Sequence, residues 1–410
     1  MRRIPLLAAI LLSLAATGVA NAAWIGTWGA SPTAPSPARG PFPASPSYEN
    51  QTIRQIVRIS AGGQRLRVVL TNAYGDKSLA IGAVHVALAG EGGAIQPGTD
   101  HVVTFNDAAS AMIPAGAPLV SDPIDLPGPA LTSLAVSIYL PDATGPCTCH
   151  GTGAQTGYVA AGDVVGATAM PADAAKIQFR AFLQGVEVDA APGAKTIVAF
   201  GDSITDGLGS TTDADHRWPD ILADRLAARG GVPVGVVNEG ISGNRLLHNG
   251  AGDSALTRFD RDVLAVPGAA YVIVFEAIND IGLSNPPPAA AKFFGAGDPV
   301  TAADLIGAYK QIIARAHAHG LKVYGATITP YEGVSTYSPE GEAKRQAVNT
   351  WIRTSGAFDA VLDFDAVWRD PAHPTQIRDG WHAGDHLHGD DAGYKVMADS
   401  IDLGLFKANH

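Results

Sequence analysis

Apolar runs alternate with amphipathic segments along the C-terminal half of the chain. Five short runs without polar alternation predict strands buried on both faces: 197–200, 234–237, 271–275, 323–327 and 360–364. Segments with apolar residues three or four apart predict helices between and after these runs: 217–229, 255–265, 302–319, 339–353 and 391–401. This order requires right-handed crossovers, and it predicts an α/β domain over residues 195–410 with a parallel five-stranded sheet between helices.

The first half of the chain has a different pattern. Short strand-like runs, separated by Gly, Pro, Asn and Asp, occur without a helical period: 52–59, 66–71, 79–88, 101–105, 133–140 and 176–182. They predict an all-β sandwich domain over residues 23–190, joined to the next domain by an Ala/Pro/Gly linker. Trp24 and Trp28 open this domain. We expect them to pack within it, the alternative being a sugar-stacking platform.

The N-terminus predicts an export signal. Met1-Arg-Arg is basic, residues 4–16 are apolar, and Ala20-Asn-Ala22 has the small residues of a cleavage site. Residues 1–22 are therefore expected to be a signal peptide and the mature protein to be secreted or periplasmic. A transmembrane anchor is the alternative, but the apolar core is short for a bilayer, so we expect no stable membrane insertion.

The net charge and the cysteine content limit the classes of substrate and cofactor that we expect the protein to bind. The formal net charge is −11, with 28 Lys and Arg against 39 Asp and Glu, which argues against nucleic acid and anionic membranes and favours a neutral substrate. Cys147 and Cys149 are the two cysteines. In an oxidising compartment they either close a tight disulfide or, with His150, begin a metal site. No second ligand cluster is evident, so we expect no metal and no other cofactor. The oligomeric state is not indicated.

A serine follows the first strand of the α/β pattern, in Gly201-Asp-Ser203. A helix that starts at Ser203 would direct free N–H groups at an oxyanion formed there, as acyl transfer requires. A helix-capping turn is the alternative. Near the C-terminus, Asp385 and His388 lie three residues apart. One turn can then present both, with Asp385 orienting His388 as the general base for Ser203.

The order of these motifs resembles the GDSL or SGNH hydrolase superfamily. Two intermediate blocks of that family are matched by Asn238-Glu-Gly-Ile-Ser-Gly-Asn-Arg245 and by Ala277-Ile-Asn-Asp280. The resemblance implies a flavodoxin-like hydrolase domain and an oxyanion hole formed by the backbone N–H groups of Ser203 and Gly243 and the side-chain amide of Asn279. Two positions depart from the family pattern: Ala277 stands at the usual glycine, and Gly389 follows the histidine where proline is common.

A second resemblance covers the β-rich half. Trp24-Ile-Gly-Thr-Trp28, Arg54-Gln-Ile-Val-Arg58 and Asn72-Ala-Tyr-Gly75 are similar to a two-domain branch of the superfamily related to acetylxylan esterases. It implies a serine esterase that removes acetyl groups from a carbohydrate such as acetylated xylan. The alternative is a general short-chain carboxylesterase or lipase-like hydrolase acting on a small-molecule ester.

Two readings of other classes stay open at this point. One is a metallohydrolase, because His and Asp residues are dense near the C-terminus: His382, Asp385, His386, His388, Asp390 and Asp391. That reading leaves the serine turn unexplained, and His386 and His388 share no helical face. The other is an inert carbohydrate-binding protein on the same scaffold. Since serine, histidine and aspartate all occupy matching positions, the sequence favours the esterase.

Overall fold

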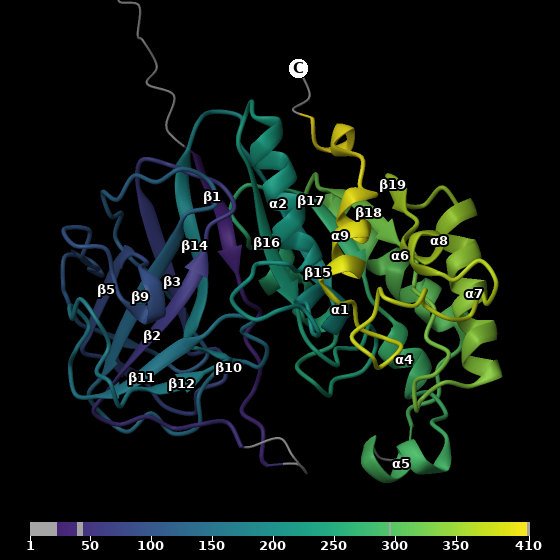
Figure 1. Cartoon of the computed structure of the whole chain (residues 1–410), viewed down its shortest axis with the longest axis horizontal. Helices are drawn as coiled ribbons and strands as arrows, with labels where there is room; N and C mark the ends of the chain where they lie inside the picture. The colour runs from purple at the N-terminus through teal and green to yellow at the C-terminus, as the bar shows by residue number, and fades with distance from the viewer. Residues whose placement is uncertain (1–22, 39–43, 295–296, 408–410) are drawn as a thin grey trace, which may run out of the picture.

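The computed structural model describes residues 23–38, 44–294 and 297–407. The predicted signal peptide, residues 1–22, lies outside them. We call the described part of residues 23–190 the β half and the described part of residues 195–410 the α/β half; they lie side by side (Figure 1). In these ranges no helix is long and apolar enough to cross a membrane.

The α/β half contains the predicted five-stranded sheet. Its strand order is β16-β15-β17-β18-β19, and every neighbouring pair is parallel. The strands are β15 (Lys195–Gly201), β16 (Val234–Gly240), β17 (Ala269–Phe275), β18 (Lys322–Ala326) and β19 (Ala360–Leu362). The α/β fold class inferred from the sequence is therefore confirmed.

Helices cover both faces of this sheet (Figure 1). On one face, Val198 and Phe200 of β15 share a core with α6 (Ala302–Ala318) and α7 (Pro339–Thr354). Their neighbours Ile197 and Ala199 point to the other face and share a core with α2 and α9. These helices span Trp218–Arg229 and Asp391–Asp399. Because successive side chains of a strand alternate between faces, both sets are buried and the strand is apolar throughout.

The shorter helices differ in places from the expected pattern. They are α1 (Ser203–Asp206), α3 (Ala255–Phe259), α4 (Ile278–Gly282), α5 (Pro288–Phe294), α8 (Phe364–Trp368), two 3₁₀ turns (Glu91–Gly93 and Leu403–Phe406) and a π turn (Asp260–Leu264). The single helix expected over 255–265 is thus α3 followed by the π turn. The strand expected over 360–364 stops at Leu362, because Asp363 accepts the N–H of Ala366 and caps α8.

The β half is a sandwich of antiparallel sheets. One sheet has the order β1-β14-β3-β8 and the other β12-β11-β2-β9-β5-β6, with short pairs β10-β13 and β4-β7. The strands are β1 (Ala23–Gly29), β2 (Gln51–Arg58), β3 (Leu66–Thr71), β4 (Leu79–Ile81), β5 (Ala83–Leu88), β6 (His101–Val102), β7 (Ala111–Ile113), β8 (Pro118–Val120), β9 (Ser133–Leu140), β10 (Cys149–His150), β11 (Gly157–Ala161), β12 (Ala175–Ile177), β13 (Arg180–Ala181) and β14 (Leu183–Ala190).

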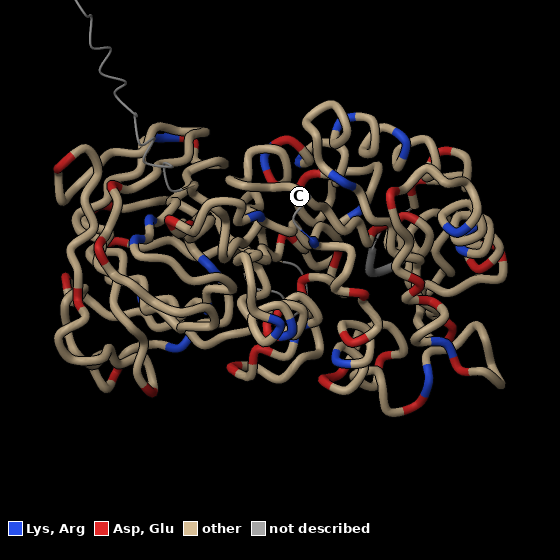
Figure 2. Tube along the Cα trace, turned by 90° about the horizontal axis from the view of Figure 1, so that it is seen from above, with Lys and Arg blue, Asp and Glu red and all other residues tan. Residues whose placement is uncertain are grey.

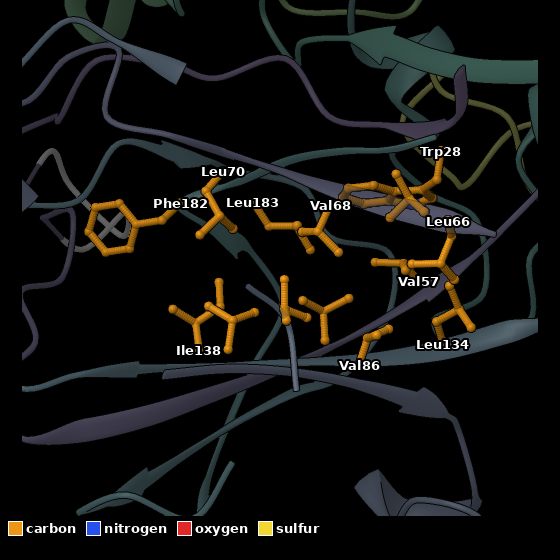
Figure 3. Packing of buried hydrophobic residues seen from close by; sticks show 14 of the residues in the cluster. Trp28, Val57, Leu66, Val68, Leu70, Val86, Leu134, Ile138, Phe182 and Leu183 are labelled. Carbon is orange, nitrogen blue, oxygen red and sulfur yellow. The ribbon is translucent and has the colours of Figure 1, made fainter. Parts of the chain in front are cut away.

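Apolar side chains of the two sheets meet between them. Figure 3 shows Val68 and Leu70 of one sheet facing Val86 and Ile138 of the other, and all are buried. Trp28 lies in the same core, and the guanidinium of Arg180 covers its ring. Trp24 is covered by the guanidinium of Arg67, 4.4 Å from the ring centroid. Trp28 is therefore packed in the core, as expected, and Trp24 is partly buried beneath Arg67.

Three predicted strands of the β half are shorter or interrupted. The run 176–182 splits into β12 and β13, which belong to different sheets, because Arg180 turns inward and donates to the carbonyls of Ile56 and Gly153. The run 79–88 breaks at Gly82, where a Cβ would fall 2.6 Å from the ring of Tyr139. The run 101–105 is a strand only at His101–Val102. The pattern of apolar residues in the sequence does not show that a polar side chain such as that of Arg180 points inward.

The two halves are joined by hydrogen bonds and close backbone contacts. Ser60 Oγ of the β half both donates to the carbonyl of Val236 and accepts its N–H. Strand β1 lies against β16, and a Cβ on Gly235 would fall 2.1 Å from the carbonyl oxygen of Gly26. The charged residues are interspersed along both halves (Figure 2). The β half is thus packed directly on the edge of the parallel sheet.

Candidate active site

Ser203 lies at the carboxyl edge of the parallel sheet. Strand β15 ends at Gly201, and Asp202 caps α1 by accepting the N–H of Ile204 at 2.9 Å. A Cβ on Gly201 would fall 2.4 Å from the carbonyl oxygen of Phe275 on the next strand, so this turn requires glycine. Ser203 is the first residue of α1, and its backbone N–H is therefore one of the free donors at the helix start.

The structure brings Ser203, His388 and Asp385 together, as the sequence predicts. Ser203 Oγ lies 2.8 Å from His388 Nε2, although the residues are 185 positions apart. His388 Nδ1 lies 2.5 Å from Asp385 Oδ2. Because the carboxylate can only accept, Nδ1 carries the proton and Nε2 is left to accept the serine hydroxyl. This order of donors is that of a serine nucleophile with a histidine base.

Asp385 is held in its ionised form. Partial burial acts to raise its pKa, but the hydrogen bonds from the ring and backbone N–H of His388 and from the N–H of Leu387 outweigh burial. They hold the pKa of Asp385 well below its usual range. The carboxylate is then ionised near neutral pH and can accept the Nδ1 proton of His388.

The three predicted oxyanion donors follow three neighbouring strands. Ser203 follows β15, Gly243 follows β16 and Asn279 follows β17. Within the described residues, the backbone N–H groups of Ser203 and Gly243 have no hydrogen-bond acceptor. The amide of Asn279 donates to the carbonyl of Asn244 at 2.9 Å, and its second N–H is not used in this bond. Each residue therefore has one N–H free for a ligand.

Asp280 supports the loop that carries Gly243. Its carboxylate is buried and accepts the N–H groups of Leu246 and Leu247, at 2.6 and 3.0 Å. In the structure Asp280 therefore has a supporting contact with this loop. The consecutive side chains of Asn279 and Asp280 thus both bind the loop that carries Gly243.

A buried charged cluster lies beneath these loops. Arg258 donates to the carbonyls of Gly201 and Glu239 and faces the carboxylate of Glu276. Burial raises the pKa of Asp202 to about 7, and burial together with Asp202 raises that of Glu276. The turn before Ser203 is therefore tied to an internal arginine that no local motif indicated.

Ala277 occupies a backbone conformation that favours glycine. Its φ is +90° and its ψ is −8°, in the left-handed region. The family resemblance places a glycine at this position, and the structure shows why: a residue with a Cβ is strained there. The methyl group is nevertheless fully buried in the core of the α/β half.

The remaining C-terminal histidines shape the loop that carries His388. His382 Nδ1 accepts the backbone N–H groups of Gly384 and His386, and the rings of His382 and His386 lie 4.4 Å apart. Across the described residues, no group of three or more His, Cys, Asp and Glu side chains is arranged to hold a metal ion. Cys147 and Cys149 form a disulfide, one of the two roles the sequence left open.

Sequence reasoning missed two buried residues next to the site. Asp206 lies one helical turn after Ser203, and His150 of the β half lies 3.0 Å from its carboxylate. Asp206 has a local signal, its spacing from the serine. His150 has none, because the contact depends on how the two halves pack.

Comparison with known proteins gives a family for this region. Residues 199–396 match the model of the GDSL-like Lipase/Acylhydrolase family. A search of curated proteins gave no match. Among solved structures, a lipase/acylhydrolase from Enterococcus faecalis is 24% identical, with 53% of this chain and 99% of that chain covered and a TM-score of 0.40.

Two other solved structures have similar values. A lipolytic protein of the G-D-S-L family from Desulfitobacterium hafniense DCB-2 is 24% identical, covering 50% of this chain and 97% of that chain with a TM-score of 0.37. The acetyl xylan esterase AlAXEase is 19% identical, covering 50% and 96% with a TM-score of 0.37. The family match spans the serine, both intermediate blocks and the histidine. Residues 199–396 belong to the GDSL-like lipase/acylhydrolase family, and the chain is a carboxylic ester hydrolase.

Proposed function

We propose that the chain is a serine esterase that hydrolyses short-chain acyl esters through an acyl-enzyme, and that its substrate is an acetylated neutral carbohydrate such as acetylated xylan. The observation that supports the mechanism best is the continuous contact from Ser203 Oγ to His388 Nε2 and from His388 Nδ1 to Asp385 Oδ2, at 2.8 and 2.5 Å. The predicted signal peptide supports action in the periplasm or outside the cell.

The reaction follows from the positions of the protons. Ser203 Oγ attacks the ester carbon while its proton passes to His388 Nε2, and the carbonyl electrons move onto oxygen. When the tetrahedral intermediate collapses, the alcohol leaves with that proton and the acyl group stays on Ser203. Water then loses a proton to His388 and attacks the acyl carbon. The acid is released as Ser203 Oγ takes that proton back from His388. Asp385 keeps the ring in its productive tautomer throughout.

We expect three N–H groups to stabilise the oxyanion. The backbone N–H groups of Ser203 and Gly243 and the free N–H of Asn279 are the candidates. Such preorganised donors act where charge develops, and losing one costs about 10²- to 10³-fold in rate.

A short acyl group is favoured by the surface near the site. Of the large apolar side chains that are exposed in the described part of the chain, only Leu208 belongs to a segment next to Ser203. An acetyl group needs little apolar surface, whereas a long acyl chain needs more than one exposed leucine side chain. The net charge of −11 favours a neutral substrate over an anionic one.

The motifs shared with the acetylxylan-esterase branch have structural roles in the β half. Arg54 is buried and donates to Ser137 Oγ and to the carbonyl of Gly93, and Asn72 donates to the carbonyl of Lys77. These residues stabilise the sandwich. Acetate release from candidate carbohydrates tests the substrate part of the proposal.

Three measurements test the proposal. A fluorophosphonate probe should label the protein, and Ser203→Ala should abolish labelling; an unlabelled wild-type protein would contradict a serine esterase and leave an inert binding protein. Hydrolysis of p-nitrophenyl acetate, butyrate and octanoate should then be compared with acetate release from acetylated xylan. Fastest turnover of octanoate with no acetate from xylan would overturn the deacetylase and favour a lipase-like enzyme. Insensitivity of the rate to chelators is expected; loss of activity on chelation would favour the metallohydrolase.

A further inference from the structure

The Cys-Thr-Cys-His segment of the β half enters the region of the candidate active site. His150 follows the disulfide of Cys147 and Cys149, and strand β10 pairs with β13. On its other side, the N–H of Thr33 donates to the carbonyl of Cys149 at 2.7 Å. The backbone that carries His150 is thus fixed within the β half, although its side chain reaches the α/β half.

The His150 ring is buried between two oxygen atoms. Its Nδ1 lies 3.0 Å from the carbonyl oxygen of Ser31, and its Nε2 lies 3.0 Å from Asp206 Oδ1. Only 5% of the residue is exposed. A carbonyl and a carboxylate can only accept, so a ring that carries a proton on each nitrogen satisfies both contacts.

Asp206 connects this ring to the predicted oxyanion loop. Its second oxygen, Oδ2, accepts the backbone N–H of Ser242 at 2.9 Å and the Ser242 hydroxyl at 2.7 Å. Ser242 directly precedes Gly243. Burial acts to raise the pKa of Asp206, but the charge and hydrogen bond of His150 and the bond from Ser242 lower it more. The carboxylate is therefore ionised and holds three donors.

We propose that His150 is a positioning residue, through which the β half fixes Asp206 and thereby the N–H of Gly243 that stabilises the oxyanion. This inference rests on the proposed esterase mechanism for its effect on rate. Without His150, one oxygen of Asp206 is buried with no donor, and the carboxylate is free to turn away from Ser242. Small displacements of an oxyanion donor reduce the rate strongly, so we expect kcat to fall about 10- to 100-fold with little change in KM.

Two amide variants distinguish the contact of the His150 ring with Asp206 from its contact with the carbonyl of Ser31. The amide of His150→Gln reaches the position of Nε2 and still donates to Asp206, whereas the shorter His150→Asn reaches only the position of Nδ1. His150→Leu removes both contacts. Ser60→Ala is the matched control, because it removes a buried hydrogen bond between the halves, at Val236, far along β16 from Gly243.

The measurements are kcat and KM for p-nitrophenyl acetate, the thermal midpoint, and amide hydrogen exchange of the peptide that contains residues 241–244. We expect His150→Leu and His150→Asn to lower kcat and to speed exchange of this peptide, and His150→Gln and Ser60→Ala to leave both near wild type. If the leucine variant does not fold, the comparison of the glutamine and asparagine variants still tests whether a donor to Asp206 positions the loop.

Equal kcat and equal exchange in the glutamine and asparagine variants would overturn the proposal, as would an equal loss in Ser60→Ala. Exchange is measured without turnover. If the wild-type protein does not hydrolyse esters, the proposed function fails, and the exchange of residues 241–244 still shows whether His150 positions the loop.

Discussion

The side-chain amide of Asn279 donates a hydrogen bond to the backbone carbonyl of Asn244 over 2.9 Å. This bond joins the loop after β17 to the loop after β16. Asn279 therefore has two tasks: one N–H fixes the neighbouring loop, and the other is free for an oxyanion. A residue with only one donor could not do both.

Asn279→Ala is expected to lower kcat for p-nitrophenyl acetate by about 10²- to 10³-fold, because a preorganised donor is lost from the transition state. KM should change much less, since the ground-state carbonyl is a weaker acceptor. Steady-state kinetics of the purified variant check this. A loss below about threefold would mean that Asn279 only supports the loop.

Gly209 packs against the loop that carries His388, and it has a φ of +95°. A Cβ there would fall 2.5 Å from the carbonyl oxygen of Gly389 and 2.9 Å from the Cβ of Ala383. Gly209→Ala should therefore displace His388 and lower kcat about 10- to 100-fold, since 1 Å misplacements cost about that much. Gly98→Ala, also at positive φ but with no atom near its Cβ, is the control for backbone strain alone. Equal kcat in the two variants would contradict the contact.

The buried carboxyl of Asp202 should make stability depend on pH. Burial raises its pKa in the folded protein to about 7 from an ordinary 3.8. The folded state then binds the proton more tightly than the unfolded chain, so the free energy of unfolding should fall as pH rises from about 4 to about 7. Asp202→Asn keeps an oxygen to cap Ile204 and should flatten this decline, making the variant more stable than wild type at pH 8. Urea titrations at pH 5 and 8 measure the free energy of unfolding of each variant. The exposed Asp125→Asn serves as the control. If Asp202→Asn loses as much stability between the two pH values as wild type does, Asp202 is not the residue responsible.

Ala277→Gly is expected to change stability by less than about 1 kcal/mol. Relief of the left-handed strain gains about 1–2 kcal/mol. The loss of a buried methyl costs about 0.8 kcal/mol, and the greater freedom of glycine in the unfolded chain costs about 0.4–1 kcal/mol. These contributions nearly cancel, which explains why alanine is tolerated at the family's glycine position. Thermal unfolding of the variant measures the change in stability. A loss of unfolding free energy above about 2 kcal/mol would show that burial of the methyl group contributes more than about 0.8 kcal/mol.

The sequence predicted the parts of the site that depend on local pattern. Apolar runs located the parallel strands, because both faces of that sheet are covered, and polar residues directly after these runs were expected at one edge. The distance between Ser203 and His388 agrees with the pairing inferred from their motifs. The family resemblance supplied Gly243 and Asn279, which spacing alone did not identify.

Contacts made by inward polar side chains were not predictable. Arg258 sits in a helix with no motif, yet its guanidinium is fully buried and bonds the carbonyl of Gly201. Arg180 interrupts a run that otherwise suits one strand. His150 meets Asp206 only because the two halves pack together. In each case the partner is distant in the chain, and residue periodicity carries no information about it.

Strand β16 is an edge strand of the parallel sheet. In the β half, Ser60 hydrogen-bonds to the backbone N–H and carbonyl of Val236 in this strand, and β1 packs against it. A fragment cut at residues 190–195 to obtain a minimal catalyst would uncover this flank. Exposed strand flanks recruit further chains by intermolecular β-pairing. We therefore expect a fragment without the sandwich to associate with itself and to be less soluble than the full chain.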